Sequence, residues 1–300
     1  ISHELHLDAC RTAGVGIGRR ITGGGALYLD EGQFGWELVL HKSTLGLTSL
    51  GDVARALCEA SAAGLSRLGI DARYRPRNDI EVAGRKISGT GGFFDGDTIF
   101  YQGTVLVDMD GAKMARLLNV PAAKLAKHGE TNAAQRGVTL RELFGGTPPA
   151  LATVQAALMQ GFAETLGLDL EPGAITAAEE AAASAIFADE IGSDDFVFGI
   201  DDPTAAPGIL TGRHSGAGGT ITAYVKPEKG ARIADLVLTG DFFVTPPRTI
   251  IDLEAHLRGT DIAALEANID RFFQTANVGL LTATAADFSA AIRQALASLS

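Results

Sequence analysis

A stretch of twelve residues, Arg19–Asp30, combines two adjacent arginines with three consecutive glycines. Glycine has no Cβ, so a run of glycines lets the backbone come close to a ligand and point its N–H groups at it. Concave runs of N–H groups bind anions, and an arginine guanidinium matches the oxygens of a phosphate. The stretch is therefore a candidate phosphate-binding loop. The alternative is a tight glycine turn between two strands, with both arginines in solvent.

A second basic position, Lys86, lies in the segment 77–92. The pattern there predicts a strand, a tight turn at Ala83-Gly84 and another strand, which opens into a second glycine-rich loop at 89–92. An apolar residue and small residues follow Lys86, so its ammonium can be placed over an anion bound at that loop. Taken alone, a lysine on a hairpin is more often a solvated surface charge.

Other residues whose side chains could bind a ligand or react give weaker indications of a site. Lys124, Lys127 and Arg136 form a thin basic scatter, which is either solvated or reaches the phosphates of a ligand. The two cysteines, Cys10 and Cys58, cannot form a disulfide framework, and their spacing matches no metal motif. We expect both to be small buried side chains within helices, away from the glycine loops, in a reducing compartment.

Hydrophobic periodicity predicts the elements that must position these residues. Strands are expected at 15–20 and 26–28, on either side of the first glycine run, and at 34–41, 98–108, 220–225 and 233–238. Helices are expected at 2–12, 49–68, 112–118, 139–144, 151–166, 176–190, 249–257, 261–274 and 286–299. This mixture predicts an α+β fold.

Composition and length limit the classes of function and organisation. The chain has 300 residues and a net charge of −11, which argues against a nucleic-acid partner. No apolar run approaches membrane-spanning length, so we expect a cytoplasmic protein without a membrane partner. The range 193–219 is acidic, rich in proline and glycine and without clear periodicity, which predicts a linker between units at 1–192 and 220–300. The chain starts with Ile1, inside what reads as a folded segment, so we expect the N-terminus to be truncated.

Three separated segments together resemble the lipoate–protein ligase family, within the biotin/lipoate ligase superfamily. Arg19–Asp30 resembles the family signature R-R-x-[ST]-G-G-G-A-V-x-H-D. Asn78-Asp79-Ile80 followed by Gly84–Gly89 resembles N-D-[IL]…[GR]-[RK]-K-[IV]-S-G, and Gln102–Leu106 stands where H-G-T-L-L is usual. Weaker matches occur at Lys124, at 136–140 and at 193–196, and the segments 239–243 and 253–254 resemble the accessory domain of these ligases.

The resemblance implies a catalytic domain with a mixed β-sheet flanked by helices over 1–192, which lacks its first strands, and a small α+β accessory domain over 220–300. It also implies a reaction in two steps. Lipoate and ATP, with Mg²⁺, give lipoyl-AMP, and a lysine of a lipoyl carrier domain then attacks this mixed anhydride. The carriers would be 2-oxoacid dehydrogenase acyltransferase subunits or proteins like the glycine-cleavage H protein.

The resemblance assigns a role to individual residues. Lys86 matches the essential lysine, which stabilises negative charge at the acyl carbonyl and the adenylate phosphate. Asp79 is in addition a candidate for orienting Mg²⁺ or ribose. The positions that match nucleotide-binding and adenylate-binding residues are Arg19, Arg20, Gly23, Gly24, Gly25, Ala26, Leu27, Tyr28, Asn78, Asp79, Gly89, Gly103 and Thr104.

The chain departs from the family pattern at three places. Leu29 occupies a position where the family has histidine, Tyr101-Gln102 replaces another histidine, and Thr90–Phe93 replaces a more usual S-A-x segment. Two further enzymes and one binding protein remain as alternatives. An acyltransferase that moves octanoyl or lipoyl groups through a cysteine thioester needs an activated thiol. A biotin ligase would need an arginine- and glycine-rich adenylate loop that the chain lacks. A non-catalytic homologue that binds lipoate or carrier domains is the third alternative.

Overall fold

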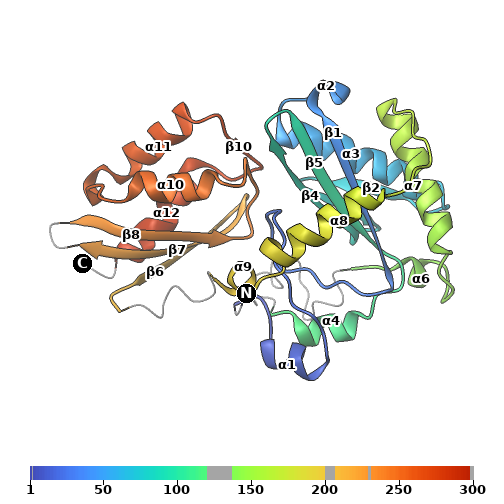
Figure 1. The fold of residues 1–300 in the computed structure, drawn as a ribbon, viewed down its shortest axis with the longest axis horizontal. Coiled ribbons are helices and arrows are strands. Elements are labelled where there is room, and N and C mark those ends of the chain that lie inside the picture. Colours follow the sequence, from blue (N-terminus) through green and yellow to red (C-terminus); the bar gives the residue numbers. More distant parts are fainter. Residues whose placement is uncertain (2, 120–136, 200–206, 229–230, 298–300) are drawn as a thin grey trace.

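The computed structural model describes residues 1, 3–119, 137–199, 207–228 and 231–297. The N-terminal part is built around a five-stranded sheet in the order β1-β5-β4-β3-β2 (Figure 1). The strands are β1 (Gln33–His41), β2 (Ala72–Arg75), β3 (Asp79–Val82), β4 (Arg85–Asp95) and β5 (Thr98–Leu106). The neighbouring strands of this sheet are all antiparallel, where a mixed sheet was expected, and one isolated parallel bridge joins Lys86 to Gly137.

Two long helices cover one face of this sheet and form its core. They are α3 (Leu50–Ser66) and α7 (Leu151–Leu166). Helix α3 begins where the Ser49 side chain accepts a hydrogen bond from the backbone N–H of Asp52. The two helices approach closely at Gly161, which has no side chain: a Cβ there would lie 2.5 Å from the Ala60 carbonyl oxygen. The expected helices at 49–68 and 151–166 are thus confirmed.

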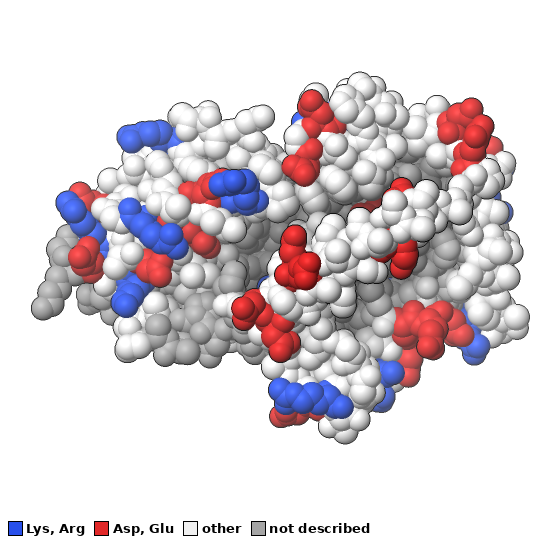
Figure 2. All heavy atoms as spheres, viewed as in Figure 1, with Lys and Arg blue, Asp and Glu red and all other residues white. Residues whose placement is uncertain are grey.

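The other face of the sheet has a different cover. Helix α8 (Ala177–Ile186) crosses in front of it, and a π-helical turn (Phe187–Ile191) follows. Every residue from 171 to 190 is exposed, so α8 buries no side chain against the sheet. The space-filling view shows α8 as a rod with hollowed surface on both sides, and acidic side chains lie on and around it (Figure 2).

Shorter elements connect these layers. They are α1 (Leu7–Thr12), α2 (Lys42–Leu45), α4 (Gly111–Leu117), α6 (Leu140–Leu143) and α9 (Asp194–Phe198). Within the part of the chain that the structure describes, no helix has both the length and the apolar character needed to cross a bilayer.

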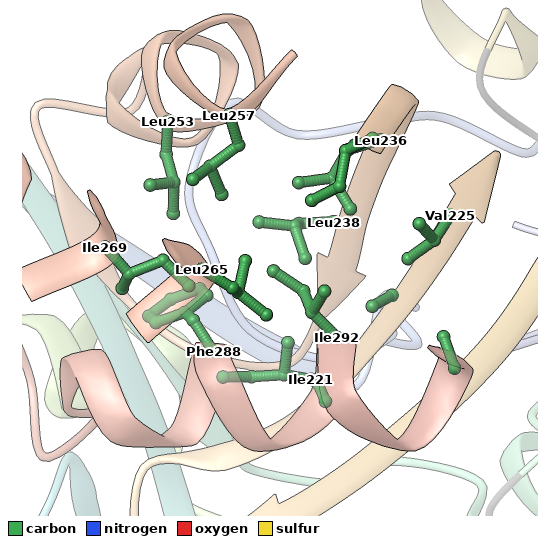
Figure 3. Close-up of a cluster of buried hydrophobic side chains, with 14 of the residues drawn as sticks. Ile221, Val225, Leu236, Leu238, Leu253, Leu257, Leu265, Ile269, Phe288 and Ile292 are labelled. Carbon is green, nitrogen blue, oxygen red and sulfur yellow. The ribbon is translucent and has the colours of Figure 1, made fainter. Parts of the chain in front are cut away.

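The C-terminal part has its own sheet and core. Its sheet has the order β6-β7-β8, from β6 (Leu210–Gly216), β7 (Gly219–Glu228) and β8 (Arg232–Gly240). The helices α10 (Thr249–Leu257), α11 (Leu265–Thr275) and α12 (Ala285–Leu296) pack on it, and a 3₁₀ turn (Ile262–Ala264) precedes α11. Figure 3 shows the side chains between them, among which Phe288, Leu253 and Leu236 are fully buried. The α+β class is confirmed in both parts.

The two parts are joined by buried contacts as well as by the chain. A two-stranded ribbon of β9 (Val244–Thr245) and β10 (Gly279–Leu280) lies beside the end of β4 (Figure 1). The Thr245 hydroxyl accepts a hydrogen bond from the Phe94 N–H at 2.6 Å and donates to the Phe94 carbonyl at 3.2 Å. Leu281 is buried in the same hydrophobic cluster as Leu50 and Val53 at the start of α3. The C-terminal part therefore completes the core of the N-terminal part.

The structure corrects the sequence prediction in three segments. Residues 15–20 and 26–28 are not strands, because no described strand lies beside them to complete a ladder. Residues 89–92 are not a loop, because they pair with β5 inside β4. The predicted linker at 193–219 contains α9 and β6, and β6 pairs with β7 along its whole length.

Candidate active site

The candidate active site lies on the sheet face opposite α3, where β4 and β3 meet. Strand alternation and the register place Asp79, Gly89 and Thr104 side by side on this face. Lys86 joins them, because its side chain folds over Gly89: a Cβ on Gly89 would lie 2.6 Å from the Lys86 Nζ. Only glycine leaves room for the ammonium there. The structure therefore brings together four residues that the sequence assigned to the site.

The Lys86 ammonium is held by an ion pair. Its Nζ lies 2.6 Å from Asp79 Oδ1, and Arg75 Nη2 lies 2.7 Å from Asp79 Oδ2. Burial alone would raise the pKa of Asp79, but the charges and hydrogen bonds of Lys86 and Arg75 hold it below its ordinary value. The Lys86 side chain keeps 37% of its surface exposed, so an anionic ligand can reach it from the open side.

The backbone around Lys86 is fixed from a distant segment. The Val138 N–H donates to the Lys86 carbonyl at 2.8 Å, next to the parallel bridge at Gly137. The neighbouring Arg85 turns away from the site, where it donates to the Gly137 carbonyl and pairs with Glu142. Because β4 is pinned on this side by residues 137 and 138, the lysine projects from a rigid strand.

Below the site, a buried polar network ties Asn78 to β4. The Thr90 N–H and hydroxyl both donate to the Asn78 carbonyl at 2.9 Å, and the Asn78 amide donates to the Thr90 carbonyl. The Thr90 hydroxyl also lies 2.8 Å from the Tyr101 hydroxyl and 3.2 Å from the Cys58 sulfur. Asn78 is thus engaged with β4, and these hydrogen bonds fix where β3 begins.

The network also corrects the expectation that Cys58 lies away from the glycine-rich segments. Cys58 is on α3 as predicted, but its sulfur contacts Thr90 directly under the site. The residue is fully buried, and burial raises the pKa of its thiol to about 11. Burial likewise raises the pKa of Tyr101 well above its ordinary value. These groups stay neutral and serve as hydrogen-bonding partners.

The two arginines of the triple-glycine loop are turned toward protein carbonyls. Arg20 Nη2 donates to the Gly23 carbonyl at 2.9 Å and to the Gly25 carbonyl at 2.7 Å, and burial lowers the pKa of Arg20. Arg19 donates to the carbonyls of Phe196 and Val197 on α9. Both guanidinium groups therefore shape and anchor the loop, and the phosphate contacts expected of them stay a prediction.

The glycines of this loop make room for the C-terminal part. A Cβ on Gly23 would lie 2.6 Å from the Phe242 carbonyl oxygen. Gly24 has a φ of +98°, which favours glycine, and a Cβ there would lie 3.0 Å from the Phe243 ring. The Ala26 N–H donates to the Glu4 carboxylate at 2.9 Å. In this structure that backbone N–H of the loop is thus taken by a carboxylate of the chain itself, and phosphate binding by the loop stays a prediction.

One side chain links the loop to the sheet face. The Gln102 amide, which stands at a histidine position of the family pattern, donates to the Thr22 hydroxyl at 2.9 Å. Gln102 pairs with Gly91 across β4 and β5, so it lies on the same face as Gly89. The loop and the lysine are therefore two sides of one surface.

Other predicted site residues lie elsewhere. Gly103 is on the opposite, core face, where a Cβ would lie 2.4 Å from the Trp36 ring. Tyr28 is buried next to Cys10 and Leu117, and burial together with Asp30 raises its pKa to about 12. Leu27 and Leu29 are exposed. The basic residues Lys124, Lys127 and Arg136 lie outside the described residues.

The residues that the structure describes do not form a protein-held metal site. Both oxygens of Asp79 already pair with cations, and among the described residues no group of three His, Cys, Asp or Glu side chains could hold a metal ion. Asp79 is therefore a partner of Lys86 rather than a magnesium ligand in this structure.

Sequence reasoning missed three residues that the structure places at the site. Arg75 shares Asp79 with Lys86, Thr90 is the centre of the buried network, and Phe243 reaches the site from the C-terminal part. An arginine four residues before an aspartate on a predicted hairpin was a usable signal for the first. The other two depend on tertiary contacts between segments 11 and 151 residues apart, such as Thr90–Tyr101 and Phe94–Thr245.

The chain is similar to known proteins both in sequence and in structure. The model of the lipoyl protein ligase A/B catalytic domain matches residues 1–163. An octanoyltransferase LipM from Kyrpidia tusciae is 29% identical over 208 residues, which are 62% of this chain and 75% of the relative. A probable lipoate-protein ligase A from Mycoplasma pneumoniae is 30% identical over 170 residues, which are 55% of this chain but only 49% of the relative.

Solved structures give the same assignment. A bi-partite lipoate protein ligase from Thermoplasma acidophilum, studied with its E2 lipoyl domain, has 26% identity and a TM-score of 0.57, over 68% of this chain and 79% of that one. A lipoate-protein ligase A bound with ATP has 25% identity and a TM-score of 0.57, over 66% of this chain and 78% of that one. LipL1 of P. falciparum, at 18% identity, shares the fold over 92% of this chain and 76% of its own length, with a TM-score of 0.66.

Proposed function

The chain belongs to the lipoyl protein ligase A/B catalytic-domain family, and from this premise we propose that it is an ATP-dependent lipoate–protein ligase. It would activate lipoate to lipoyl-AMP and transfer the lipoyl group to a lysine of a lipoyl carrier domain. The family also contains octanoyltransferases, as the relative from Kyrpidia tusciae indicates, so the chemistry of the site must decide between the two reactions.

The observation that carries the proposal is the contrast between the lysine and the thiols. Transfer through an enzyme thioester needs an accessible thiolate. Cys58 is fully buried with a thiol pKa of about 11, and Cys10 is 3% exposed. The Lys86 ammonium, in contrast, is accessible on the site face. The site thus presents a charge stabiliser and no nucleophilic sulfur, which favours a reaction in which the enzyme forms no covalent intermediate.

The first step of this reaction needs stabilisation of negative charge. A carboxylate oxygen of lipoate attacks the α-phosphorus of ATP, a new P–O bond forms, and pyrophosphate leaves with the electrons of the broken P–O bond. Lys86 would lie between the acyl carboxylate and the α-phosphate and neutralise charge that increases in the transition state. To do so it exchanges its contact with Asp79 for contacts with the substrate, and Arg75 keeps Asp79 paired.

The second step transfers the acyl group. The neutral amine of a carrier lysine attacks the carbonyl carbon of lipoyl-AMP, an amide bond forms, and AMP leaves with the electrons of the C–O bond while the nitrogen loses a proton. The same ammonium would stabilise the oxyanion of the tetrahedral intermediate. The carrier surface would belong to 2-oxoacid dehydrogenase acyltransferase subunits or to proteins like the glycine-cleavage H protein, in line with the E2 lipoyl domain studied with the Thermoplasma acidophilum ligase.

The nucleotide would lie along the triple-glycine loop. The Ala26 N–H, which holds the Glu4 carboxylate, supports binding of an anionic oxygen there. Arg20 contributes by fixing the shape of the loop through two carbonyls. Mg²⁺ would arrive as a complex with the ATP phosphates, since the described residues offer it no ligand set of their own.

The proposal is tested by incubating the protein with lipoate, ATP, Mg²⁺ and an apo lipoyl domain, and by measuring the mass of that domain. We expect an ATP-dependent mass increase that Lys86→Ala abolishes. Lys42→Ala is the matched control, because Lys42 is also paired with an aspartate but lies away from the site. Modification from an octanoyl carrier without ATP would instead establish the transferase, and carrier binding without any modification would establish a non-catalytic homologue.

A further inference from the structure

The loop between β2 and β3 holds Arg77 in an unfavourable backbone conformation. The φ of Arg77 is +98°, in the region that favours glycine and that a residue with a side chain adopts only at a cost. The loop consists of the three residues 76–78, because Arg75 and Asp79 on either side of it are already paired in the sheet. An arginine keeps such a conformation only where the surrounding structure holds it, so the contacts of Arg77 must compensate for the cost.

Hydrogen bonds from two parts of the molecule hold Arg77. Its Nη1 donates to the carbonyl oxygen of Ala217 at 2.7 Å, although the two residues are 140 apart in the sequence. The Tyr74 hydroxyl donates to the Arg77 carbonyl at 3.4 Å. The backbone of Arg77 is thus bonded to its own hairpin, and its side chain is bonded to the C-terminal part.

The Ala217 carbonyl is a fixed anchor for this arginine. Ala217 lies in the turn between β6 and β7, and its carbonyl also accepts a hydrogen bond from the Thr282 hydroxyl at 3.3 Å. The next residue, Gly218, packs directly on the backbone of Ala283, since a Cβ on Gly218 would lie 2.3 Å from the Ala283 Cα. Leu281, beside these residues, is buried in the cluster at the start of α3. The contacts that dock the C-terminal part therefore determine where the Ala217 carbonyl lies.

After Arg77 the chain leads directly into the candidate active site. The carbonyl of Asn78 accepts hydrogen bonds from the N–H and the hydroxyl of Thr90, both at 2.9 Å. Asp79 Oδ1 then lies 2.6 Å from the Lys86 Nζ. Because Asn78 and Asp79 directly follow Arg77, a rotation of the backbone at Arg77 would move both of these contacts. The partner of the lysine is thus placed by a loop that is itself bonded to the C-terminal part.

We propose that Arg77 is a positioning residue for the reaction at Lys86: its bond to the Ala217 carbonyl holds the loop 76–78 in the conformation that aligns Asp79 with the lysine. This role deepens the proposed function and rests on the part given there to Lys86. Without the bond, the backbone at Arg77 relaxes to a negative φ, Asp79 turns with it, and the ammonium loses its fixed place. The C-terminal part therefore sets the geometry of the site through one hydrogen bond.

Two variants of Arg77 test this role, because both remove the bond but only one keeps the cost of the positive φ. In the lipoylation assay, Arg77→Ala should lower kcat by at least about tenfold with little change in KM for ATP, since it misplaces a charge stabiliser. Arg77→Gly should recover part of this loss, because glycine adopts a φ of +98° without the side-chain penalty. Hydrogen exchange of the Thr90 amide, which donates to Asn78, should be fastest in Arg77→Ala and slowest in the wild type. Arg73→Ala is the matched control: it removes an arginine of the same hairpin that pairs with the nearby Asp71, and it should change neither kcat nor this exchange rate.

The outcomes separate the role of Arg77 from the proposed function. That role is refuted if Arg77→Ala keeps the wild-type kcat and the wild-type exchange of the Thr90 amide. It is also refuted if Arg77→Ala and Arg77→Gly lose activity equally, because the loss would then not depend on the conformation of the loop. If the wild type shows no ATP-dependent activity, the proposed function fails, and exchange of the Thr90 amide alone decides whether Arg77 holds the loop. If Arg77→Ala does not fold, a reduced kcat of Arg77→Gly with an unchanged KM supports the role, and a wild-type kcat refutes it.

Discussion

The hydrogen bonds of Thr245 give the sharpest prediction about how the two parts hold together. Thr245→Val keeps the shape of the side chain and removes the hydroxyl that bonds the N–H and the carbonyl of Phe94. Thr245 is 3% exposed and Phe94 is 8% exposed, so water cannot replace the lost partner at either group. A buried polar group left unpaired costs about 1–3 kcal/mol, and here there are two, the carbonyl bond being the longer. We expect a loss of about 2–4 kcal/mol in the free energy of unfolding.

Urea denaturation measures this loss, followed by fluorescence of Trp36, the single tryptophan of the chain. Trp36 packs in the N-terminal core, so its signal reports on the part of the molecule that Thr245 contacts from outside. Hydrogen exchange of the Phe94 amide should accelerate in the same variant. Thr245→Ser, which keeps the hydroxyl and loses one methyl group, should cost only about 0.8 kcal/mol.

An exposed threonine provides the control, since Thr275→Val removes a hydroxyl from the surface of α11 and should change stability by less than about 0.5 kcal/mol. The reasoning is refuted if Thr245→Val is as stable as the wild type, or if Thr245→Ser and Thr245→Val lose the same amount. Either result would mean that the apolar contacts of Leu281 dock the C-terminal part without help from these bonds.

Three further predictions concern the site and its sheet. Cys58→Ala should leave kcat/KM unchanged. The wild-type thiol should react with a disulfide reagent at pH 8 only after urea is added, since its pKa is about 11. Loss of turnover in a folded Cys58→Ala protein would restore the thioester alternative. Gly103→Ala should lower the free energy of unfolding, measured in urea, by about 1–3 kcal/mol, because its Cβ would overlap the Trp36 ring. Gly35→Ala on the neighbouring strand, where a Cβ would have nothing within 4 Å, should cause no such loss. Equal losses of stability in the two variants would contradict the packing argument. Arg75→Met should lower stability at pH 7 by about 1 kcal/mol, the value of a partly exposed ion pair. Since the folded-state pKa of Asp79 lies below its unfolded value, this difference should be present above about pH 4 and vanish as the pH falls through the folded value, and a difference that persists at pH 2 would show a cause other than Asp79.

Local sequence signals were enough to predict the helices and strands that are determined by residues close together in the chain. Helix α3 has a serine cap, a continuous apolar stripe and an end near glycine, and the structure begins and ends it within two residues of the prediction. The hairpin of β3 and β4 was predicted from its turn at Ala83-Gly84, where both residues have positive φ. In such elements the determining contacts lie within a few residues along the chain.

Segments whose structure depends on a distant partner were not predictable in the same way. Residues 15–20 have the composition of a strand, but a strand exists only where a neighbour pairs with it. The glycines at 89, 91 and 103 look alike in the sequence, yet each makes room for a different group, Lys86, Phe243 or Trp36. Which group that is depends on the face of the sheet, and the bulge between Ile80 and Glu81 sets the register beside Lys86 without a signal in the sequence.

The type of a residue also predicted what its side chain can bind better than it predicted where that side chain points. Arg19 and Arg20 can bind phosphate, but carbonyls of α9 and of their own loop are nearer, and the guanidinium groups bond those. Lys86 was assigned through its resemblance to the family and is found where an anion can reach it. The role of Lys86 in the reaction stays a prediction until the assay is done.

The contact between Thr245 and Phe94 also bears on aggregation, because it covers part of a strand edge in the N-terminal sheet. Beyond the pairing of Asp79 with Gly89, β3 no longer covers β4, and the backbone of Gly91–Asp95 on that side would be an open strand edge next to two phenylalanines. Uncovered, apolar edges of this kind act as templates for aggregation. The Thr245 hydroxyl of the β9–β10 ribbon bonds the N–H and the carbonyl of Phe94 at this edge, so we expect a chain cut before residue 207 to accumulate as inclusion bodies even though Lys86 is intact. We therefore expect the C-terminal part to protect the N-terminal part from aggregation.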